Sequence, residues 1–276
     1  MFSVFAIQPM TITSETLFHF TNSRLNLENI LFSRFKLSYC KETFVQSEDA
    51  ISAYFPMISF CDIPLSLAKS HIEKYGNYAI GMEKKWGIEN KLNPVLYLEN
   101  SSLIYSDFRE SFTHFSSTLK GLYDLENFMK EESNIEMVKV LENLEKLGNT
   151  QINLVRYSKP YQGKLVRKHE TYDNYRFYDE REWRYVPKIE DNELAWMLNE
   201  EEYLKYRGNN ETKPLFEKPI LNFTSEDIKY LIVAEQSDIK PLIDKLGLIK
   251  NLYSSKDDFE ILITKIFTVE QLKADF

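Results

Sequence analysis

A stretch without strand character in the middle of the chain constrains the fold more than any other feature. From about residue 101 to 148, apolar residues recur every three or four positions, which is the period of an α-helix. Strand-like apolar runs lie on both sides of this stretch, and several of them lead into a helical pattern. The pattern predicts an α+β fold with a mixed sheet core and a helical insertion of two or more helices at about 101–148.

The flanking elements follow from apolar periodicity and from turn residues. Pro64 is well placed to open a helix, and Gly76 with Asn77 is suited to end it near Tyr75. A polar, basic and aromatic stretch at 157–178 has little periodicity, and we expect an ordered loop there. The remaining expected elements are strands at 17–21, 56–60, 78–82, 94–98, 182–186, 220–223, 228–234 and 259–267, and helices at 25–31, 64–75, 237–246 and the C-terminus.

Length and composition limit the class of protein. The 276 residues, 43% of them hydrophobic, suffice for a sizeable core, and no repeat or Gly/Ser linker divides them, so we predict a single elaborated domain over 1–276. The net charge of −8 argues against non-specific coating of nucleic acid. Cys40 and Cys61 lack zinc-ligand spacing with the four histidines, and we predict no metal site. Since no apolar run is long enough to span a bilayer, we expect a cytoplasmic protein without a membrane partner.

A concentration of charge on a predicted strand marks the candidate site. Residues 175–187 read Tyr-Arg-Phe-Tyr-Asp-Glu-Arg-Glu-Trp-Arg-Tyr-Val-Pro. Unpaired buried charge is strongly unfavourable, so these groups must meet a ligand or one another. Glu182 is the first candidate for chemistry, and Glu180, two residues earlier, would share its strand face. Two alternatives stay open for Arg184, which either forms a structural ion pair with Glu182 or points away from it and pairs with Asp179, Glu180 or a phosphate.

Familiar catalytic motifs are absent from the chain. It has no Gly-rich dinucleotide fingerprint, no P-loop lysine, no His-Glu-x-x-His and no Gly-x-Ser-x-Gly. Its carboxylates also lack metal-binding spacing, which gives a nuclease little support.

Several rare strings in one order carry a resemblance to a known family. They are Phe-His-Phe-Thr at 18–21, Pro-Met-Ile-Ser-Phe-Cys-Asp-Ile-Pro-Leu-Ser at 56–66, Tyr-Gly-Asn-Tyr-Ala-Ile-Gly at 75–81, Lys-Trp-Gly at 85–87, Asn-Pro-Val-Leu-Tyr at 93–97, Lys-Pro-Tyr at 159–161 and Phe-Tyr-Asp-Glu-Arg-Glu-Trp-Arg-Tyr-Val-Pro at 177–187. Over roughly 17–190 the chain resembles the AbiGi family of bacterial abortive phage-infection proteins, often described as antitoxins. The resemblance implies antiviral defence in a toxin–antitoxin system, with a cognate toxin or antitoxin, or a phage component, as partner.

A looser resemblance implies a chemistry. A His-x-Thr strand followed by a helix, a middle strand with aromatic, Ser and Asp residues, and a late Glu on a strand is similar in order to ADP-ribosyltransferases, including the DarT-like DNA-modifying group. This implies an ADP-ribosyltransferase-like fold with NAD as substrate and a protein or nucleic-acid acceptor. The implied catalytic carboxylate is Glu182 or Glu180, and the implied NAD-binding residues are His19, Thr21, Ser59, Asp62, Tyr75, Tyr78 and Arg184. The chain departs from that pattern in lacking a clear Ser-Thr-Ser strand.

The physical demands of that reaction are few. Cleaving the nicotinamide–ribose bond expels a neutral leaving group, and positive charge develops on an oxocarbenium-like ribose. One fixed carboxylate beside the ribose is therefore the key group. The basic segment around His169 could also touch a nucleic-acid acceptor.

Simpler structural roles suit most of these residues. His19 is compatible with a core or capping role, Thr21 and Asp62 with helix capping, and Tyr75 and Tyr78 with packing. A non-catalytic antitoxin or sensor is therefore the alternative to an enzyme. It predicts that Glu182→Gln leaves function intact, whereas changes at 101–148 break a partner interface.

Overall fold

A mixed β-sheet forms the centre of the computed structural model, which describes residues 14–43, 52–111, 114, 117–118, 121, 135–167, 170–188, 195–208, 220–249 and 251–275. The sheet has eight strands in the order β12-β11-β4-β1-β3-β10-β5, with β2 paired to β3 beside this path. Only β11 and β12 pair in parallel; the other pairs in this sheet are antiparallel. The strands are β1 (Thr16–Thr21), β2 (Ser38–Thr43), β3 (Ser52–Cys61), β4 (Tyr78–Glu83), β5 (Asn93–Pro94), β10 (Glu182–Tyr185), β11 (Ile228–Val233) and β12 (Ile266–Thr268). The predicted α+β class is confirmed.

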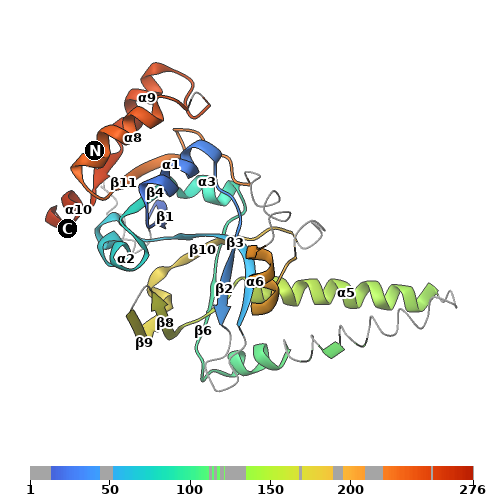
Figure 1. The fold of residues 1–276 in the computed structure, drawn as a ribbon. Coiled ribbons are helices and arrows are strands. Elements are labelled where there is room, and N and C mark those ends of the chain that lie inside the picture. The colour runs from blue at the N-terminus through green and yellow to red at the C-terminus, as the bar shows by residue number, and fades with distance from the viewer. Residues whose placement is uncertain are drawn as a thin grey trace, which may run out of the picture.

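Helices cover both faces of this sheet (Figure 1). Successive strand residues point to opposite faces, so Leu17 packs in one apolar cluster with α1 and α8, while Phe18 packs in a second cluster with α2 and α10. The helices are α1 (Arg24–Ser33), α2 (Ala68–Tyr75), α3 (Lys84–Glu89), α5 (Ile135–Arg156), α6 (Glu200–Gly208), α8 (Ile239–Leu246), α9 (Lys256–Ile263) and α10 (Val269–Asp275). None of the described helices is long and apolar enough to cross a membrane.

The helix after Pro64 begins as a 3-10 turn, Leu65–Leu67, and continues as α2 to Tyr75. Gly76 ends it at φ 126°, a conformation that L side chains rarely adopt. A Cβ on Gly76 would lie 2.3 Å from the carbonyl oxygen of Thr21. This close approach fixes the end of α2, and with it Tyr75, against the end of β1.

The insertion is helical in its described parts, as expected. Residues 103–111 are helical, and α5 continues past 148 to Arg156. Figure 1 shows α5 projecting away from the sheet. Much of the predicted insertion between 112 and 134 lies outside the described residues.

The loop predicted at 157–178 is wrong. The segment forms β7 (Ser158–Pro160), which pairs in parallel with β6 (Leu96–Leu98), and a hairpin of β8 (Gln162–Arg167) and β9 (Glu170–Arg176). Along β8 only Gly163 and Leu165 are buried, and most residues of β9 are exposed. A hairpin that is mostly exposed has little apolar alternation, so the sequence carries little strand signal.

Three other predicted strands need correction. The strand at 259–267 is helix α9 followed by the short β12, and Ser255 with Asp258 forms a capping box that the strand prediction overlooked. The strand at 220–223 is reduced to a single bridge between Leu221 and Phe35. The strand at 94–98 is divided between β5 and β6, which belong to different sheets. Strand β2 and helix α3 were not predicted.

Candidate functional site

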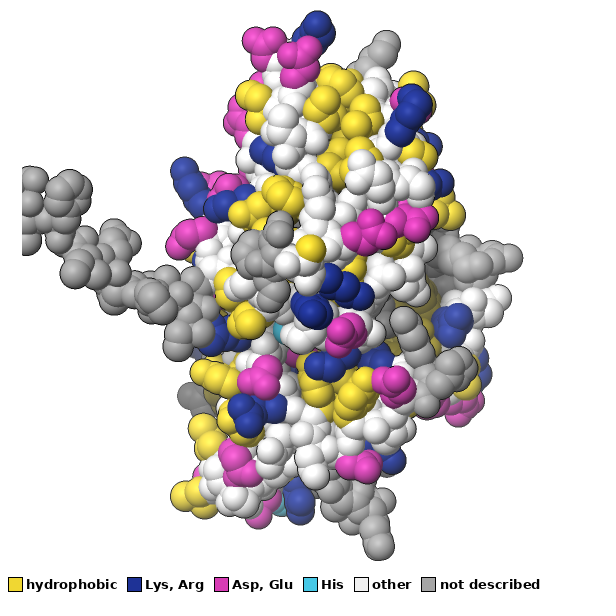
Figure 2. Space-filling view, turned by 90° about the vertical axis from the view of Figure 1, so that its left-hand side faces the viewer, with side chains coloured by type: hydrophobic (Ala, Val, Ile, Leu, Met, Phe, Trp, Pro, Cys, Tyr) yellow, Lys and Arg dark blue, Asp and Glu magenta, His cyan; other side chains and the backbone are white. Residues whose placement is uncertain are grey.

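A cleft of about 610 Å³ opens where β1, β2 and β3 meet the β8–β9 hairpin and the turn Phe177–Glu180. Figure 2 shows a hollow near the centre of one face, where a His side chain is visible below Lys and Arg side chains. The cleft is lined by Phe18, His19, Phe20, Cys40, Lys41, Glu42, Thr43, Ser59, Cys61, Tyr75, Lys159, Pro160, Lys164, Leu165, Val166, Arg167, Phe177, Glu180 and Glu182. It therefore contains both candidate carboxylates.

A second, more open hollow of about 690 Å³ lies at Arg34 and Phe223. The Arg34 guanidinium donates to the carbonyl oxygens of Leu31 and Asn251 and lies 4.9 Å from the centre of the Phe223 ring. These contacts explain Arg34 as a structural group. We place the candidate site in the first cleft, because ionisable groups converge there.

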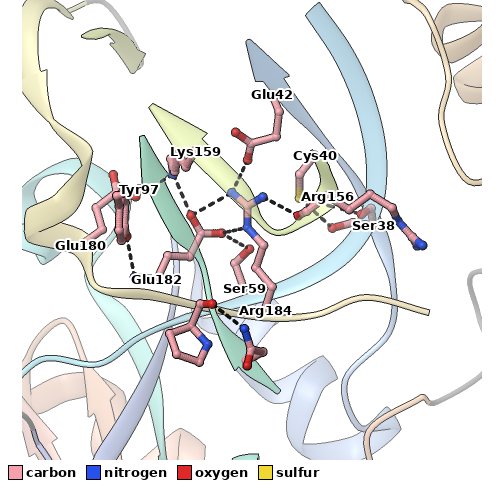
Figure 3. Close-up of polar contacts among 12 residues, drawn as sticks. Ser38, Cys40, Glu42, Ser59, Tyr97, Arg156, Lys159, Glu180, Glu182 and Arg184 are labelled. Atoms are coloured by element: carbon pink, nitrogen blue, oxygen red, sulfur yellow. Dashed lines mark hydrogen bonds and ion pairs between the residues drawn. The ribbon is translucent and has the colours of Figure 1, made fainter. Parts of the chain in front are cut away.

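Lys159 links the two candidate carboxylates at the floor of the cleft (Figure 3). Its Nζ donates to Glu180 Oε2 at 2.8 Å and to Glu182 Oε2 at 2.7 Å. The three side chains come from β7, from the turn before β10 and from β10 itself. Burial alone would lower the pKa of Lys159, but Glu180 and Glu182 raise it well above its usual value, so Lys159 is a fixed cation.

Hydrogen-bond donors occupy all acceptor positions of the Glu182 carboxylate. Its Oε1 accepts from Ser59 Oγ at 2.7 Å and from Arg184 Nε at 2.6 Å, and its Oε2 accepts from Lys159 at 2.7 Å and from Arg184 Nη2 at 3.1 Å. A carboxylate has about four acceptor positions, and these contacts use all of them. Burial favours the protonated form, but Arg184 and Lys159 hold the pKa of Glu182 well below its usual range.

Arg184 does not point away from Glu182, so that expectation was wrong. Residues two apart on a strand share a face, and the Arg184 guanidinium lies behind the Glu182 carboxylate, fully buried. It also donates to Glu42 Oε1 at 2.6 Å and to the carbonyl oxygen of Arg156 at 2.8 Å. The structural ion pair considered from the sequence is therefore present, and Arg184 is absent from the described lining of the cleft.

Glu180 does not share a strand face with Glu182, because it ends a 3-10 turn that precedes β10. It still reaches the same lysine, and its other oxygen accepts from Tyr75 Oη. The Tyr175 hydroxyl is a third hydrogen-bonding neighbour of Glu180, which leaves about one of its four acceptor positions unused. Among the described carboxylates of the cleft floor, Glu180 is better placed than Glu182 to accept a hydrogen bond from a ligand.

Glu42 is a third carboxylate of the cleft, and the sequence did not suggest it. It comes from β2 and is held by Arg184. Burial raises the pKa of Glu42, although Arg184 acts in the opposite direction. Three carboxylates thus share two buried cations, Lys159 and Arg184. With all five groups ionised, this cluster carries one excess negative charge.

His19 lies between the cleft and the core. Its Nδ1 is 2.8 Å from the carbonyl oxygen of Ser59, and its ring contacts Phe35 and Phe60. A carbonyl oxygen only accepts, so Nδ1 carries the proton and Nε2 of the neutral ring is an acceptor. Burial lowers the pKa of His19 and so favours the neutral ring. The hydrogen bond to Ser59 acts in the opposite direction but is the smaller effect.

Besides Arg184, three predicted NAD-binding residues are not among the described lining of the cleft. Thr21 pairs with Tyr78 at the end of β1, and Tyr78 Oη donates to Asp238 at 3.0 Å. Asp62 accepts from Lys84 Nζ at 2.8 Å and from the Ser14 amide at 3.2 Å. The first turn after Pro64 has no side-chain cap, so Asp62 is a salt-bridge residue and not a helix cap.

The structure thus brings His19, Ser59, Tyr75, Glu180 and Glu182 together around one cleft. Sequence reasoning missed Glu42, and it missed the central role of Lys159, whose only signal was its place in the Lys-Pro-Tyr string.

Two cysteines, Cys40 and Cys61, also line the cleft. Burial raises the pKa of both thiols. Within the described ranges, no group of three or more His, Cys, Asp or Glu side chains could hold a metal ion. His169, the proposed nucleic-acid contact, lies outside the described residues.

Comparisons with known proteins place the chain in a family. Residues 33–234 match the model of a family described as "Putative abortive phage resistance protein AbiGi, antitoxin". The chain is 29% identical over 241 residues to "Abortive phage resistance protein AbiGi" from Lactococcus lactis subsp. cremoris, an alignment that covers 81% of this chain and 89% of that relative. No solved structure matches the chain. The family match covers more than half of the sequence, and the chain therefore belongs to the AbiGi family of abortive phage resistance proteins.

Proposed function

We propose that this abortive-infection protein is an ADP-ribosyltransferase-like effector that binds NAD and transfers ADP-ribose to a macromolecular target. One observation carries the proposal: the cleft floor holds three carboxylates against two cations, and Glu180 among them keeps acceptor capacity. A fixed carboxylate with acceptor capacity left favours a reaction in which positive charge develops on the substrate beside it.

Glu180 is the proposed ribose-binding carboxylate. Loss of neutral nicotinamide leaves an oxocarbenium-like ribose, which a nearby carboxylate stabilises. Glu180 would accept a hydrogen bond from a ribose hydroxyl through the acceptor position that Tyr75, Tyr175 and Lys159 leave unused. Glu182, saturated by Ser59, Lys159 and Arg184, would instead hold Lys159 in place and add negative potential.

Other side chains of the cleft suit the parts of NAD beyond the nicotinamide ribose. Arg167 lies over the Tyr75 ring at 5.2 Å from its centre, and Lys164 lines the same cleft. Cations at this position suit the diphosphate of NAD or the phosphates of a nucleic-acid acceptor. His19 Nε2, an acceptor in the neutral ring, suits the adenosine side that the resemblance implies.

Nicotinamide release tests the proposal. Purified protein is incubated with NAD, with and without oligonucleotides or bacterial lysate as acceptor, and nicotinamide is quantified. We expect release by the wild type and its loss in Glu180→Gln. Glu260→Gln, which changes an exposed carboxylate of α9, is the matched control and should release as much as the wild type. Absence of release under every acceptor condition would refute the enzymatic proposal.

A non-catalytic antitoxin is the second candidate, because the matching family is described as an antitoxin. In that role the cleft would be a structural charge cluster, and Glu180→Gln would leave protection of cells from a co-expressed toxin unchanged. The two candidates are separated by comparing nicotinamide release with toxin neutralisation for this one variant.

A further inference from the structure

The insertion helix α5 carries an exposed apolar stripe at a regular spacing. Val140, Leu147 and Leu154 recur every seven residues and are 50%, 62% and 39% exposed. At 3.6 residues per turn, positions seven apart lie almost on one line along a helix. Scattered exposed apolar residues are common on protein surfaces, but these three lie in one line along the helix.

One flank of this stripe is buried against the protein, and the other flank carries exposed positive charge. On one side lie Ile152 and Val155, both buried, and Val155 packs in a cluster that contains Phe108 and residues of β3. On the other side lie Lys139 and Lys146, which are also seven residues apart and exposed. The stripe therefore runs between the protein body and a row of positive charge.

We infer that this stripe, Val140, Leu147 and Leu154 with the flanking Lys139 and Lys146, is a docking surface for an amphipathic helix of a partner protein, and that the partner helix carries acidic residues beside its apolar face. The inference rests on the partner-binding candidate above and not on the chemistry of the cleft. An apolar stripe at this spacing accepts the apolar face of a second helix, and charges beside such a seam select the partner.

Charge argues against a second copy of this chain as the occupant. In a symmetric antiparallel pair of α5 helices, the lysine rows would face one another across the seam, and like charges there are unfavourable. Asn143 and Thr150, exposed polar residues between the apolar positions, make the stripe narrower than a full coiled-coil seam. Affinity should therefore depend on the flanking lysines as well as on the leucines.

Two designed peptides test the surface on the full-length protein. Both are amphipathic helices with the same leucine face, one flanked by glutamate and the other by lysine, and both carry a fluorescent label for anisotropy measurements. We expect the acidic peptide to bind more tightly. Leu147→Asp should weaken that binding about tenfold, because it places a charge in the apolar contact. Val138→Asp is the matched control, since Val138 is 51% exposed but lies on the far side of α5.

Charge reversal gives a second, independent readout. The double variant Lys139→Glu, Lys146→Glu should bind the basic peptide in preference to the acidic one. Equal binding of both peptides by the wild type, or equal losses in Leu147→Asp and Val138→Asp, would overturn the inference. So would a dimer, detected by light scattering, that Leu147→Asp dissociates. Nicotinamide release measured on the same variants keeps this test separate from the catalytic proposal, because α5 positions 139–154 are not part of the described lining of the cleft.

Discussion

Arg184 donates hydrogen bonds to both carboxylate oxygens of Glu182, two residues earlier on β10. Nε lies 2.6 Å from Oε1 and Nη2 lies 3.1 Å from Oε2. The same guanidinium binds Glu42 on β2 and the last carbonyl group of α5. One fully buried cation thus joins the candidate site to the sheet and to the base of the insertion helix.

Replacing Arg184 should destabilise the protein strongly. Arg184→Met leaves Glu42 and Glu182 buried without their shared cation, and breaking such a pair costs about 3–5 kcal/mol. Urea denaturation monitored by tryptophan fluorescence measures this change in the free energy of unfolding. Arg176→Met is the control, because Arg176 is exposed and its ion pair with Asp179 is 3.7 Å long; a change below about 1 kcal/mol is expected there. Similar losses in both variants would contradict the role assigned to Arg184.

The stability contributed by Glu182 should depend on pH. Its folded-state pKa lies well below the unfolded value of about 4.3. The unfolded state therefore binds more protons in the acid range, and Glu182 stabilises the folded state above that value and loses this effect as the pH falls toward its folded pKa. Glu182 is one of the groups that raise the pKa of Glu42, so replacing Glu182 also lowers the pKa of Glu42 and offsets part of this pH dependence.

We therefore expect the difference in unfolding free energy between the wild type and Glu182→Gln to be largest near pH 7. It should shrink as the pH is lowered from about 5 to 2. Denaturant titrations at a series of pH values measure it, with Glu260→Gln as the exposed control. A difference that stays constant over this range would show that Glu182 is not held ionised by its partners.

Replacing Glu180 and replacing Glu182 should affect stability and nicotinamide release differently. Glu182→Gln removes the negative charge and one of the two oxygens that accept from Ser59, Lys159 and Arg184, and a fall in both stability and nicotinamide release is expected. Glu180→Gln leaves Lys159 paired with Glu182, so stability should fall less while release falls by about 100-fold or more. Melting temperature and nicotinamide release measured on both variants decide this. Full release by Glu180→Gln together with none by a folded Glu182→Gln would assign the ribose contact to Glu182 instead.

Gly76 should not tolerate a side chain. Its φ of 126° disfavours alanine, and a Cβ there would lie 2.3 Å from the Thr21 carbonyl oxygen and 2.5 Å from the Asn22 Cα. Backbone atoms cannot move aside cheaply, so Gly76→Ala should lower the free energy of unfolding by about 2–4 kcal/mol. Gly208→Ala is the matched control, because a Cβ there meets nothing within 4 Å. Thermal unfolding of the two variants measures the contrast.

Elements rich in buried apolar residues were predictable. Strands β1, β4 and β11 are short runs with consecutive buried residues, and helix α8 buries Leu242 and Leu246 one turn apart. The β8–β9 hairpin was not predictable in this way, because it is mostly exposed. Helix α9 was mistaken for a strand, since apolar residues near 259–263 outweighed the Ser255 capping signal in the prediction.

Part of the candidate site was also within reach of the sequence. A glutamate on a strand in a segment of charged and aromatic residues required charged partners if buried, and this argument identified Glu182 and considered Arg184. Glu42 could not be found in the same way, because it meets Arg184 across 142 residues of chain. Local patterns carry no information about which distant strands become neighbours.

By itself, the amino-acid sequence determined the α+β class, the helical insertion and the family, and it predicted that the segment around Glu182 belongs to the candidate site. Each of these depends on local periodicity, on rare strings or on the cost of unpaired charge. Only the tertiary structure decided which of the two predicted carboxylates, Glu180 or Glu182, keeps acceptor capacity. That depends on donors from β3, β7 and β10 converging on Glu182 and leaving Glu180 partly free, and such convergence exists only after the strands have packed.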